Sequence, residues 1–295
     1  MLSIVPTNIL FTSEILQTCI DKFISMFSCM DVSVIGFSIK GTPIYSLKLG
    51  YGPVSYLYNA AHHANEWITS VLLMRFIEDC ARQLEPVWQS LANGNEPGAL
   101  TLHSPWYERI TLHIVPMVNP DGVDIITRNR GPKIWKANAR GVDLNSNYPA
   151  DWENAKIHKY ARGYTEPGPR DFVGPCPLSE PESMAMVAYT KFIDCALTMS
   201  LHAQGEVIYW RYKEYMPFGA AELAARLSNV SGYALDDVPD ESSHAGYRDW
   251  FIQEFYRPGF TIECGLGENP LPITDFNGIY KKVYPLLMEP LIHGI

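Results

Sequence analysis

The sequence predicts an α/β fold, in which a mostly parallel sheet is covered by helices on both faces. Two observations support this prediction. Apolar, β-rich runs alternate along the chain with segments of helical periodicity. The chain is also long enough, at 295 residues of which 47% are hydrophobic and 19% charged, to bury a large core. We expect one domain spanning residues 1–295.

The first half of the chain alternates helical and extended patterns. From Thr12 to Cys29 apolar residues recur at helical spacing, with Thr12 or Ser13 available as the N-cap. Two β-rich runs then flank the turn Lys40-Gly-Thr-Pro43 and predict a hairpin. The elements expected up to the middle of the chain are the hairpin strands 32–39 and 44–49, a strand at 54–60, a helix at 66–83, and a strand at 110–118 that stops at a turn, Asn119-Pro-Asp-Gly122.

The second half begins with a long irregular segment. Residues 129–175 are rich in Gly, Pro, Asn and Arg and show little periodicity, so we expect long ordered loops with a functional role. Ser179 is the expected N-cap of the next helix, with acidic residues in its first turn. The elements expected after the loops are helices at 179–193, at 218–229 and from about residue 247, and buried strands at 197–201 and 259–263.

Charge and composition exclude several classes of partner. The chain carries 23 Lys and Arg against 32 Asp and Glu, a net charge of -9. Nucleic acids and anionic membranes both favour a basic surface, so neither is expected as a partner. The first residues hold no basic n-region and no segment is apolar enough to span a bilayer, which predicts a cytoplasmic protein, or a secreted one if a signal peptide has been removed. The six scattered cysteines predict free, mostly buried thiols, and the oligomeric state stays open.

The run Asn59-Ala-Ala-His-His-Ala-Asn-Glu-Trp67 is the most informative local feature. It places His63 and Glu66 three residues apart, where an apolar strand gives way to a helix. Two side chains at this spacing on one helical turn point the same way and can bind one metal ion. Imidazole nitrogen and carboxylate oxygen are ligands of catalytic zinc, which takes three protein ligands and keeps one position open. A third ligand therefore has to come from elsewhere in the chain. Such pairs also arise by chance, so the pair alone does not establish a metal site.

Two further polar residues lie at the carboxyl ends of apolar strands. His202 follows the strand at 197–201, and Glu263 ends the strand at 259–263. Ligands bind beyond the carboxyl ends of strands in open α/β sheets, so these side chains are expected to converge on His63 and Glu66. His202 would then complete a His2Glu zinc site, and Glu263 would lie beside it. The alternatives are a hydrogen-bonded core histidine at 202 and a simple salt bridge at 263.

Four segments resemble the zinc carboxypeptidase family, in order and in local sequence. They are His63-Ala-Asn-Glu66, Gly141-Val-Asp-Leu-Asn145, Leu201-His202 and Phe260-Thr-Ile-Glu263. The resemblance implies a three-layer α/β/α sandwich around a mixed, mostly parallel eight-stranded sheet. It also implies one zinc per chain bound by His63, Glu66 and His202, and Glu263 as the base and acid that handles the proton of the attacking water. Asp143 matches the carboxylate that orients the first histidine.

The chain departs from the family pattern at two positions. Exopeptidases of the family have an arginine after Asn145 that binds the terminal carboxylate of the substrate, and this chain has Ser146. The arginine that usually follows the tryptophan upstream, and polarises the scissile carbonyl, is here Lys136. The resemblance therefore implies that Lys136 or the nearby Arg140 stabilises the oxyanion that develops on this carbonyl.

The run from Trp135 to Pro149 resembles one branch of this family, the bacterial γ-D-glutamyl-diamino acid peptidases of cell-wall peptides. These enzymes hydrolyse the bond between the γ-carboxyl of D-glutamate and meso-diaminopimelate or lysine. Arg248 falls where the family places its specificity residue, so it is expected to bind a substrate carboxylate; the alternative is a surface arginine. Arg128 and Arg130 are further candidates, because murein peptides carry several carboxylates.

The function predicted from the sequence is therefore zinc-dependent hydrolysis of the γ-D-glutamyl bond in murein-derived peptides. Two alternatives within the fold are an ordinary metallocarboxypeptidase and a murein-peptide amidase. The alternative from another class is a peptide-binding protein that has lost catalysis. That last alternative predicts a broken ligand or base, and His63, Glu66, His202 and Glu263 are all present.

Overall fold

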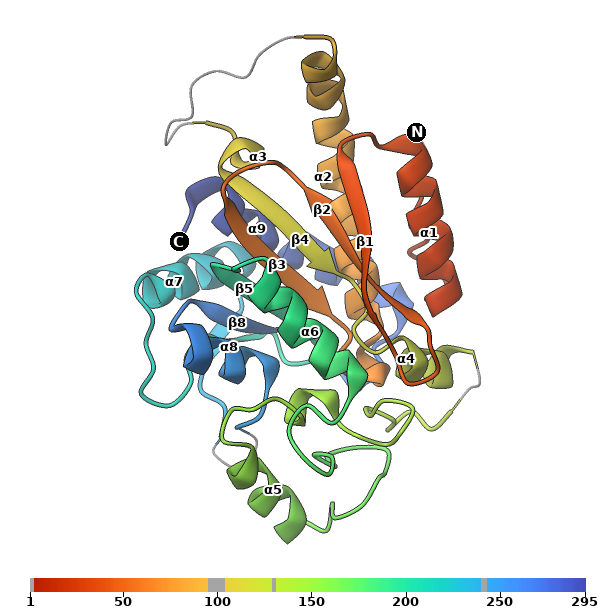
Figure 1. The fold of residues 1–295 in the computed structure, drawn as a ribbon, viewed down its shortest axis with the longest axis vertical. Helices are drawn as coiled ribbons and strands as arrows, with labels where there is room; N and C mark the ends of the chain where they lie inside the picture. The colour runs from red at the N-terminus through yellow and green to blue at the C-terminus, as the bar shows by residue number, and fades with distance from the viewer. Residues whose placement is uncertain (1–2, 95–103, 129–130, 240–242) are drawn as a thin grey trace.

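The computed structural model describes residues 3–94, 104–128, 131–239 and 243–295, and it contains an eight-stranded mixed sheet with helices on both faces (Figure 1). The strand order is β1-β2-β4-β3-β5-β8-β6-β7. The strands are β1 (Met30–Phe37), β2 (Pro43–Leu49), β3 (Val54–Ala60), β4 (Ile110–Val115), β5 (Leu197–His202), β6 (Val207–Tyr209), β7 (Ala234–Asp236) and β8 (Gly259–Glu263). The predicted fold class is confirmed.

Helices of very different length connect these strands. The α-helices are α1 (Ser13–Met26), α2 (Ile68–Ala92), α3 (Trp106–Arg109), α4 (Pro120–Thr127), α5 (Trp152–Ala161), α6 (Pro181–Phe192), α7 (Ala220–Ser231), α8 (Tyr247–Phe255) and α9 (Phe276–His293). Short 3-10 turns lie at η1 (Ala64–Glu66), η2 (Leu144–Ser146) and η4 (Ile273–Asp275). Among the residues described, no helix is both long and apolar enough to cross a membrane.

The centre of the sheet is parallel, and an antiparallel pair joins it to the flanking strands on each side, β2 with β4 and β6 with β8. Strands β4, β3, β5 and β8 run in the same direction, whereas β1 and β2 form the predicted antiparallel hairpin and β6 pairs antiparallel with β8. In the register of β5 and β8, His202 is opposite Glu263. The carboxyl ends of β3, β5 and β8 therefore lie next to one another, as the position of the candidate ligands required.

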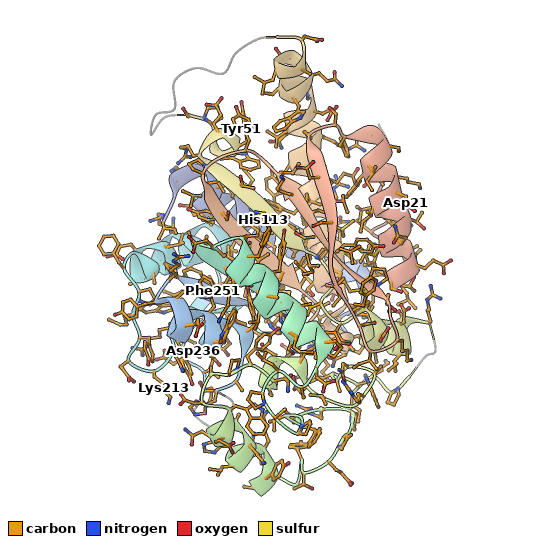
Figure 2. All side chains as sticks on the ribbon, in the orientation of Figure 1. Asp21, Tyr51, His113, Lys213, Asp236 and Phe251 are labelled. Carbon is orange, nitrogen blue, oxygen red and sulfur yellow. The ribbon has the colours of Figure 1, made fainter. Side chains whose placement is uncertain are left out.

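The two faces of the sheet bury different helices. Side chains alternate between faces along a strand, so Tyr56 and Tyr58 pack on one side and Leu57 on the other. The first face packs against α1, α2, α7 and α9, and the second against α6 and α8. Phe251 of α8 is fully buried in this second layer, whereas Asp21 projects from the outer side of α1 (Figure 2).

Several helix starts differ from the sequence prediction. Thr12 caps α1 as expected, and its side chain accepts a hydrogen bond from Ile15 N. The expected turn at Asn119-Pro-Asp-Gly122 is wrong: Asn119 is the N-cap of α4, its side chain accepts from Gly122 N, and Pro120 occupies the first helical position. Glu180 rather than Ser179 is the N-cap of α6, because the Ser179 hydroxyl instead donates to the Glu180 carboxylate.

The predicted helix beginning at Glu66 starts two residues later, at Ile68, after the 3-10 turn η1. The expected loops at 129–175 also contain α5 and η2; residues 129 and 130 lie outside the described part of the chain. The sequence reasoning did not predict β6, β7 or α9. All six cysteines are free, and five of them are buried, as expected.

Candidate active site

Three candidate metal ligands converge where β3 and β5 end. His63, in extended conformation, is the N-cap of the turn that carries Glu66, so the pair does not share an α-helical turn as predicted, but the turn still brings the two side chains together. His63 Nδ1 lies 2.8 Å from Glu66 Oε1, and His202 Nδ1 lies 2.9 Å from Glu66 Oε2. One nitrogen or oxygen from each residue lies within 4.8 Å of the others, so this cluster can hold a metal ion.

The donor set of this cluster fits zinc. The two Nδ1 atoms face each other at 3.1 Å, and all three residues are buried. Asp143 Oδ1 lies 3.2 Å from His63 Nε2, and a proton held there leaves Nδ1 as a lone-pair donor. Burial works against the charged imidazolium, but Glu66 outweighs it and raises the pKa of His63 to about 9. The cluster thus attracts positive charge where a dication would bind.

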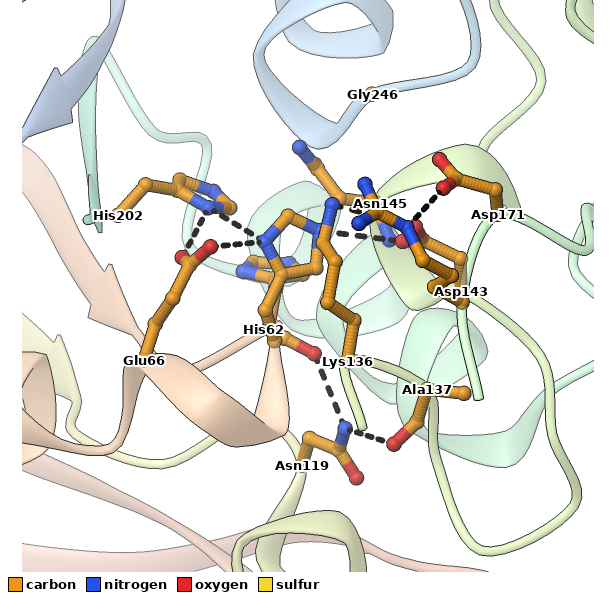
Figure 3. Close-up of polar contacts among 12 residues, drawn as sticks. His62, Glu66, Asn119, Lys136, Ala137, Asp143, Asn145, Asp171, His202 and Gly246 are labelled. Atoms are coloured by element: carbon orange, nitrogen blue, oxygen red, sulfur yellow. Dashed lines mark hydrogen bonds and ion pairs between the residues drawn. The ribbon is translucent and has the colours of Figure 1, made fainter. Parts of the chain in front are cut away.

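Lys136 lies beside this cluster. Its ammonium is 3.7 Å from Asp143 Oδ2 and its side chain is 19% exposed, so it is held near the histidine and open to the cavity. Figure 3 shows the Lys136 side chain with Glu66 and His202 to its left and with Asp143 to its right. Burial works against its charge, but Asp143 and Glu66 outweigh burial and raise the pKa of Lys136. Lys136 is therefore a cation at neutral pH.

Glu263 ends β8 directly beside the end of β5. Burial and the nearby Glu66 carboxylate raise the pKa of Glu263 to about 8. Within the described part of the chain it makes no ion pair, so the alternative of a simple salt bridge is not what the structure shows. A carboxyl group with a raised pKa can take up and release protons near neutral pH.

Of these residues, His63, Lys136, Asp143 and Glu263 line a cavity of about 650 Å³ whose wall is mostly polar. Five cationic side chains lie on it, namely those of Lys136, Lys159, Arg162, Arg170 and Arg248. Four carboxyl groups also line it, those of Asp143, Asp171, Asp249 and Glu263. An acidic chain has therefore gathered basic groups around its candidate active site, which favours an anionic ligand.

Comparison with known proteins identifies the family. The model of the zinc carboxypeptidase family matches residues 19–269. This chain belongs to the zinc carboxypeptidase family. The match spans the four sequence segments on which the resemblance was based, and the predicted class, a metallopeptidase, is confirmed with it.

One relative within this family is the gamma-D-glutamyl-L-diamino acid endopeptidase 1 of Lysinibacillus sphaericus. It is 37% identical over 292 residues, which cover 92% of this chain and 70% of that protein. Among solved structures, thrombin activatable fibrinolysis inhibitor aligns with a TM-score of 0.76 at 18% identity, over 96% of this chain and 74% of that one. The murein-tripeptide amidase MpaA from Escherichia coli O157 aligns with a TM-score of 0.55 at 20% identity, over 89% and 91% of the two chains. At these identities the two structures support the fold alone.

The position at which this member departs from the family's exopeptidases is in the cavity wall. Ser146 lines the cavity beside Asn145, whose side-chain oxygen accepts a hydrogen bond from Tyr247 N at 3.0 Å. Among the residues that the structure describes, none forms a hydrogen bond with the amide nitrogen of Asn145. No arginine stands at position 146 to bind a terminal carboxylate.

Arg248 is buried, with 5% of its surface exposed, so the alternative of a surface arginine is wrong. Its Nε donates to Asp249 Oδ1 at 3.0 Å, and its guanidinium lies 5.8 Å from the centre of the Tyr209 ring. It lines both the main cavity and an adjoining pocket of about 240 Å³ whose wall includes Arg211 and Lys213.

The remaining candidates from the sequence lie elsewhere. Arg140 does not line the cavity: its Nε donates to Glu180 Oε2 at 3.1 Å and its side chain is 53% exposed. Arg128 pairs with Glu14 and Asp124 at the end of α4, also off the cavity wall. Arg130 lies outside the described residues.

The sequence reasoning missed one group of cavity residues. These are Lys159, Arg162, Arg170 and Asp171, which come from α5 and from the loop that follows it. The only signal for them was the length of the segment at 129–175, which indicated a functional role without naming residues.

Proposed function

We propose that this chain hydrolyses the bond between the γ-carboxyl group of D-glutamate and diaminopimelate or lysine in murein-derived peptides, with one zinc per chain. The observation that carries the proposal is the cavity beside the metal cluster, which gathers five cationic side chains and has Ser146 where exopeptidases need an arginine. Murein peptides carry several carboxylates, and such a wall suits them. The 37% identity to an enzyme named for this bond also supports it.

Each residue of the site has a separate role in the proposed reaction. Zinc held by His63, Glu66 and His202 would supply Lewis-acid polarisation of the scissile carbonyl and a lowered pKa for water. Glu263 takes the proton of the attacking water and returns it to the leaving amine. Lys136 donates a hydrogen bond to the oxyanion that develops on the carbonyl oxygen. Asp143 holds His63 in the tautomer that keeps Nδ1 free.

The choice between Lys136 and Arg140 gives a prediction. Lys136→Ala is expected to lower kcat by about 10²- to 10³-fold, the usual cost of removing one oxyanion donor. Arg140→Ala, which removes a cation of the same loop that pairs with the buried Glu180, is the matched variant and is expected to keep kcat close to that of the parent, because Arg140 does not line the cavity. Steady-state kinetics of the two variants on a γ-D-glutamyl peptide would reverse the assignment if Arg140→Ala were the slower enzyme.

Arg248 gives a second prediction, on substrate binding. Arg248→Ala is expected to lower kcat/KM on a γ-D-glutamyl-diaminopimelate peptide by about 10- to 100-fold, the scale of a charge-assisted hydrogen bond, with zinc content unchanged. Arg211→Ala, in the adjoining pocket, is the comparison: its guanidinium is 41% exposed and paired with Asp237, so a smaller effect is expected. An Arg248→Ala enzyme with the kcat/KM of the parent would remove Arg248 from the substrate site.

The proposal is tested by comparing two isomeric substrates. The zinc-loaded protein is expected to hydrolyse L-alanyl-γ-D-glutamyl-diaminopimelate with a kcat/KM at least about 10²-fold above that for the α-linked isomer, because only the γ-linked peptide carries the alanylamino group and the free glutamyl carboxylate on one carbon, away from the scissile carbonyl. Preference for the α-linked isomer with a free carboxyl terminus would instead indicate an ordinary carboxypeptidase.

A further inference from the structure

A buried ion-pair cluster forms one wall of the cavity, apart from the metal ligands. Lys159 Nζ lies 2.5 Å from Asp171 Oδ1, and Arg170 Nε lies 2.5 Å from Asp171 Oδ2. Lys159 and Asp171 are more than nine-tenths buried, and Asp171 adopts a φ of 65°, which is uncommon for a residue with a side chain. The backbone and both partners thus fix the carboxylate in one place. The cluster holds two cations and one anion, so it keeps one net positive charge.

That remaining charge is on the exposed member of the cluster. Both side chains line the cavity, but that of Arg170 is 46% exposed whereas that of Lys159 is only 10% exposed. Arg170 uses its Nε for Asp171, and within the described part of the chain its terminal nitrogens donate no hydrogen bond. A guanidinium anchored through Nε presents its remaining N–H groups as a fixed fork, which suits a carboxylate.

Arg170 also belongs to the segment that holds Lys136. The carbonyl of Pro169 accepts hydrogen bonds from Lys136 N at 2.7 Å and from Ala137 N at 3.1 Å. The carbonyl of Phe172 accepts from Asp143 N at 2.8 Å. Arg170 is therefore on the side of the cavity that carries the proposed oxyanion donor, and Arg248 enters the cavity from a different element, α8.

We propose that Arg170 is a specificity-determining residue that binds the α-carboxylate of the γ-linked glutamyl residue on the acyl side of the scissile bond. The inference rests on the proposed function. A glutamyl residue linked through its γ-carboxyl carries a free α-carboxylate that three carbons separate from the scissile carbonyl, and the carbon that bears this carboxylate also bears the alanylamino group. With the carbonyl oxygen at Lys136, this carboxylate reaches the wall next to it. Arg170 binds the carboxylate on the acyl side of the scissile bond, and Arg248 binds the carboxylate on the leaving-group side. The cavity therefore selects peptides with a carboxylate on each side of that bond.

A cycle of two substrates and two enzymes tests this assignment. The substrates are L-alanyl-γ-D-glutamyl-diaminopimelate and the same peptide with the glutamyl α-carboxylate converted to the carboxamide. The enzymes are the zinc-loaded parent and Arg170→Gln, with Arg170→Lys as the conservative variant. Arg75→Gln is the matched control, because Arg75 is also a partly exposed arginine whose Nε donates to a carboxylate, that of Asp79 on α2, off the cavity wall.

The ratio of kcat/KM for the carboxylate to that for the carboxamide is the quantity to measure, because general damage to folding or catalysis cancels in it. We expect a ratio of about 10 to 100 for the parent and for Arg75→Gln, a ratio near 1 for Arg170→Gln, and an intermediate ratio for Arg170→Lys. Equal rates on both substrates by the parent, or an unchanged ratio in Arg170→Gln, would overturn the role of Arg170 while leaving γ-D-glutamyl hydrolysis intact. A parent that hydrolyses neither peptide would overturn the proposed function, and the inference with it.

Discussion

Glu263→Gln is expected to keep the fold and bind zinc like the parent while kcat falls by about 10²- to 10⁴-fold, the usual weight of general acid–base catalysis. The amide has nearly the shape of the carboxyl group but cannot accept and return a proton. Glu263 is the one carboxyl group of the cavity that lies at the end of β8 without an ion-pair partner in the described chain. Its pKa, raised to about 8 by burial and by Glu66, makes it suited to both proton transfers once a cation lies nearby to lower it.

The measurement is kcat on a γ-D-glutamyl peptide, with zinc content and unfolding temperature recorded for each variant. Glu268→Gln is the control, because Glu268 is an exposed carboxylate in the loop that follows β8. A Glu263→Gln enzyme that kept more than about a tenth of the parent's kcat would place the base elsewhere.

Removal of a metal ligand is expected to abolish activity. The purified parent should contain about one zinc per chain, and His202→Ala should retain little of it, because only two protein ligands would remain. Activity is expected to fall by more than about 10³-fold, since the carbonyl-polarising and water-activating effects of zinc are each worth several kcal/mol.

His113→Ala separates metal loss from loss of a buried histidine. His113 is buried on β4, where its ring lies 2.8 Å from the Tyr189 hydroxyl, and it is not part of the metal cluster. Elemental analysis of both variants after dialysis against zinc is the measurement. The site assignment fails if His202→Ala binds zinc as the parent does, or if His113→Ala loses zinc to the same extent.

The central strands were predictable because local pattern and tertiary role agree there. The runs at 54–60, 197–201 and 259–263 are apolar and β-rich, and the structure has strands at those residues. Since parallel neighbours end at the same edge of a sheet, the convergence of His63, His202 and Glu263 followed from the strand ends alone. The metal cluster was therefore the most predictable part of the site.

Other elements depend on contacts that local pattern does not encode. Strands β6 and β7 are three residues each, too short to show a period of two, and they exist through their pairing with β8 and with each other. Asn119-Pro-Asp-Gly122 suits a turn as well as a helix start, and here Asn119 caps α4 while its amide also bonds to His62 O and Ala137 O. Tertiary bonds thus selected the helix.

The substrate-binding wall was the least predictable part. Lys159 and Asp171 are twelve residues apart in a segment without periodicity, and only the folded loop brings them together. Arg140 and Lys136 were equivalent in sequence, and they separated only when the structure paired Arg140 with Glu180 on the outside of the cavity. Loop residues far apart in sequence become a site through chain geometry that composition does not fix.

The account's central claim is the identity of the bond that is cut, and the products of one peptide test it most directly. The zinc-loaded protein is incubated with the tetrapeptide L-alanyl-γ-D-glutamyl-diaminopimelyl-D-alanine, and the products are identified by mass spectrometry. We expect two dipeptides, L-alanyl-D-glutamate and diaminopimelyl-D-alanine. Release of free D-alanine with the tripeptide left intact would contradict the claim and assign the chain to ordinary carboxypeptidase activity.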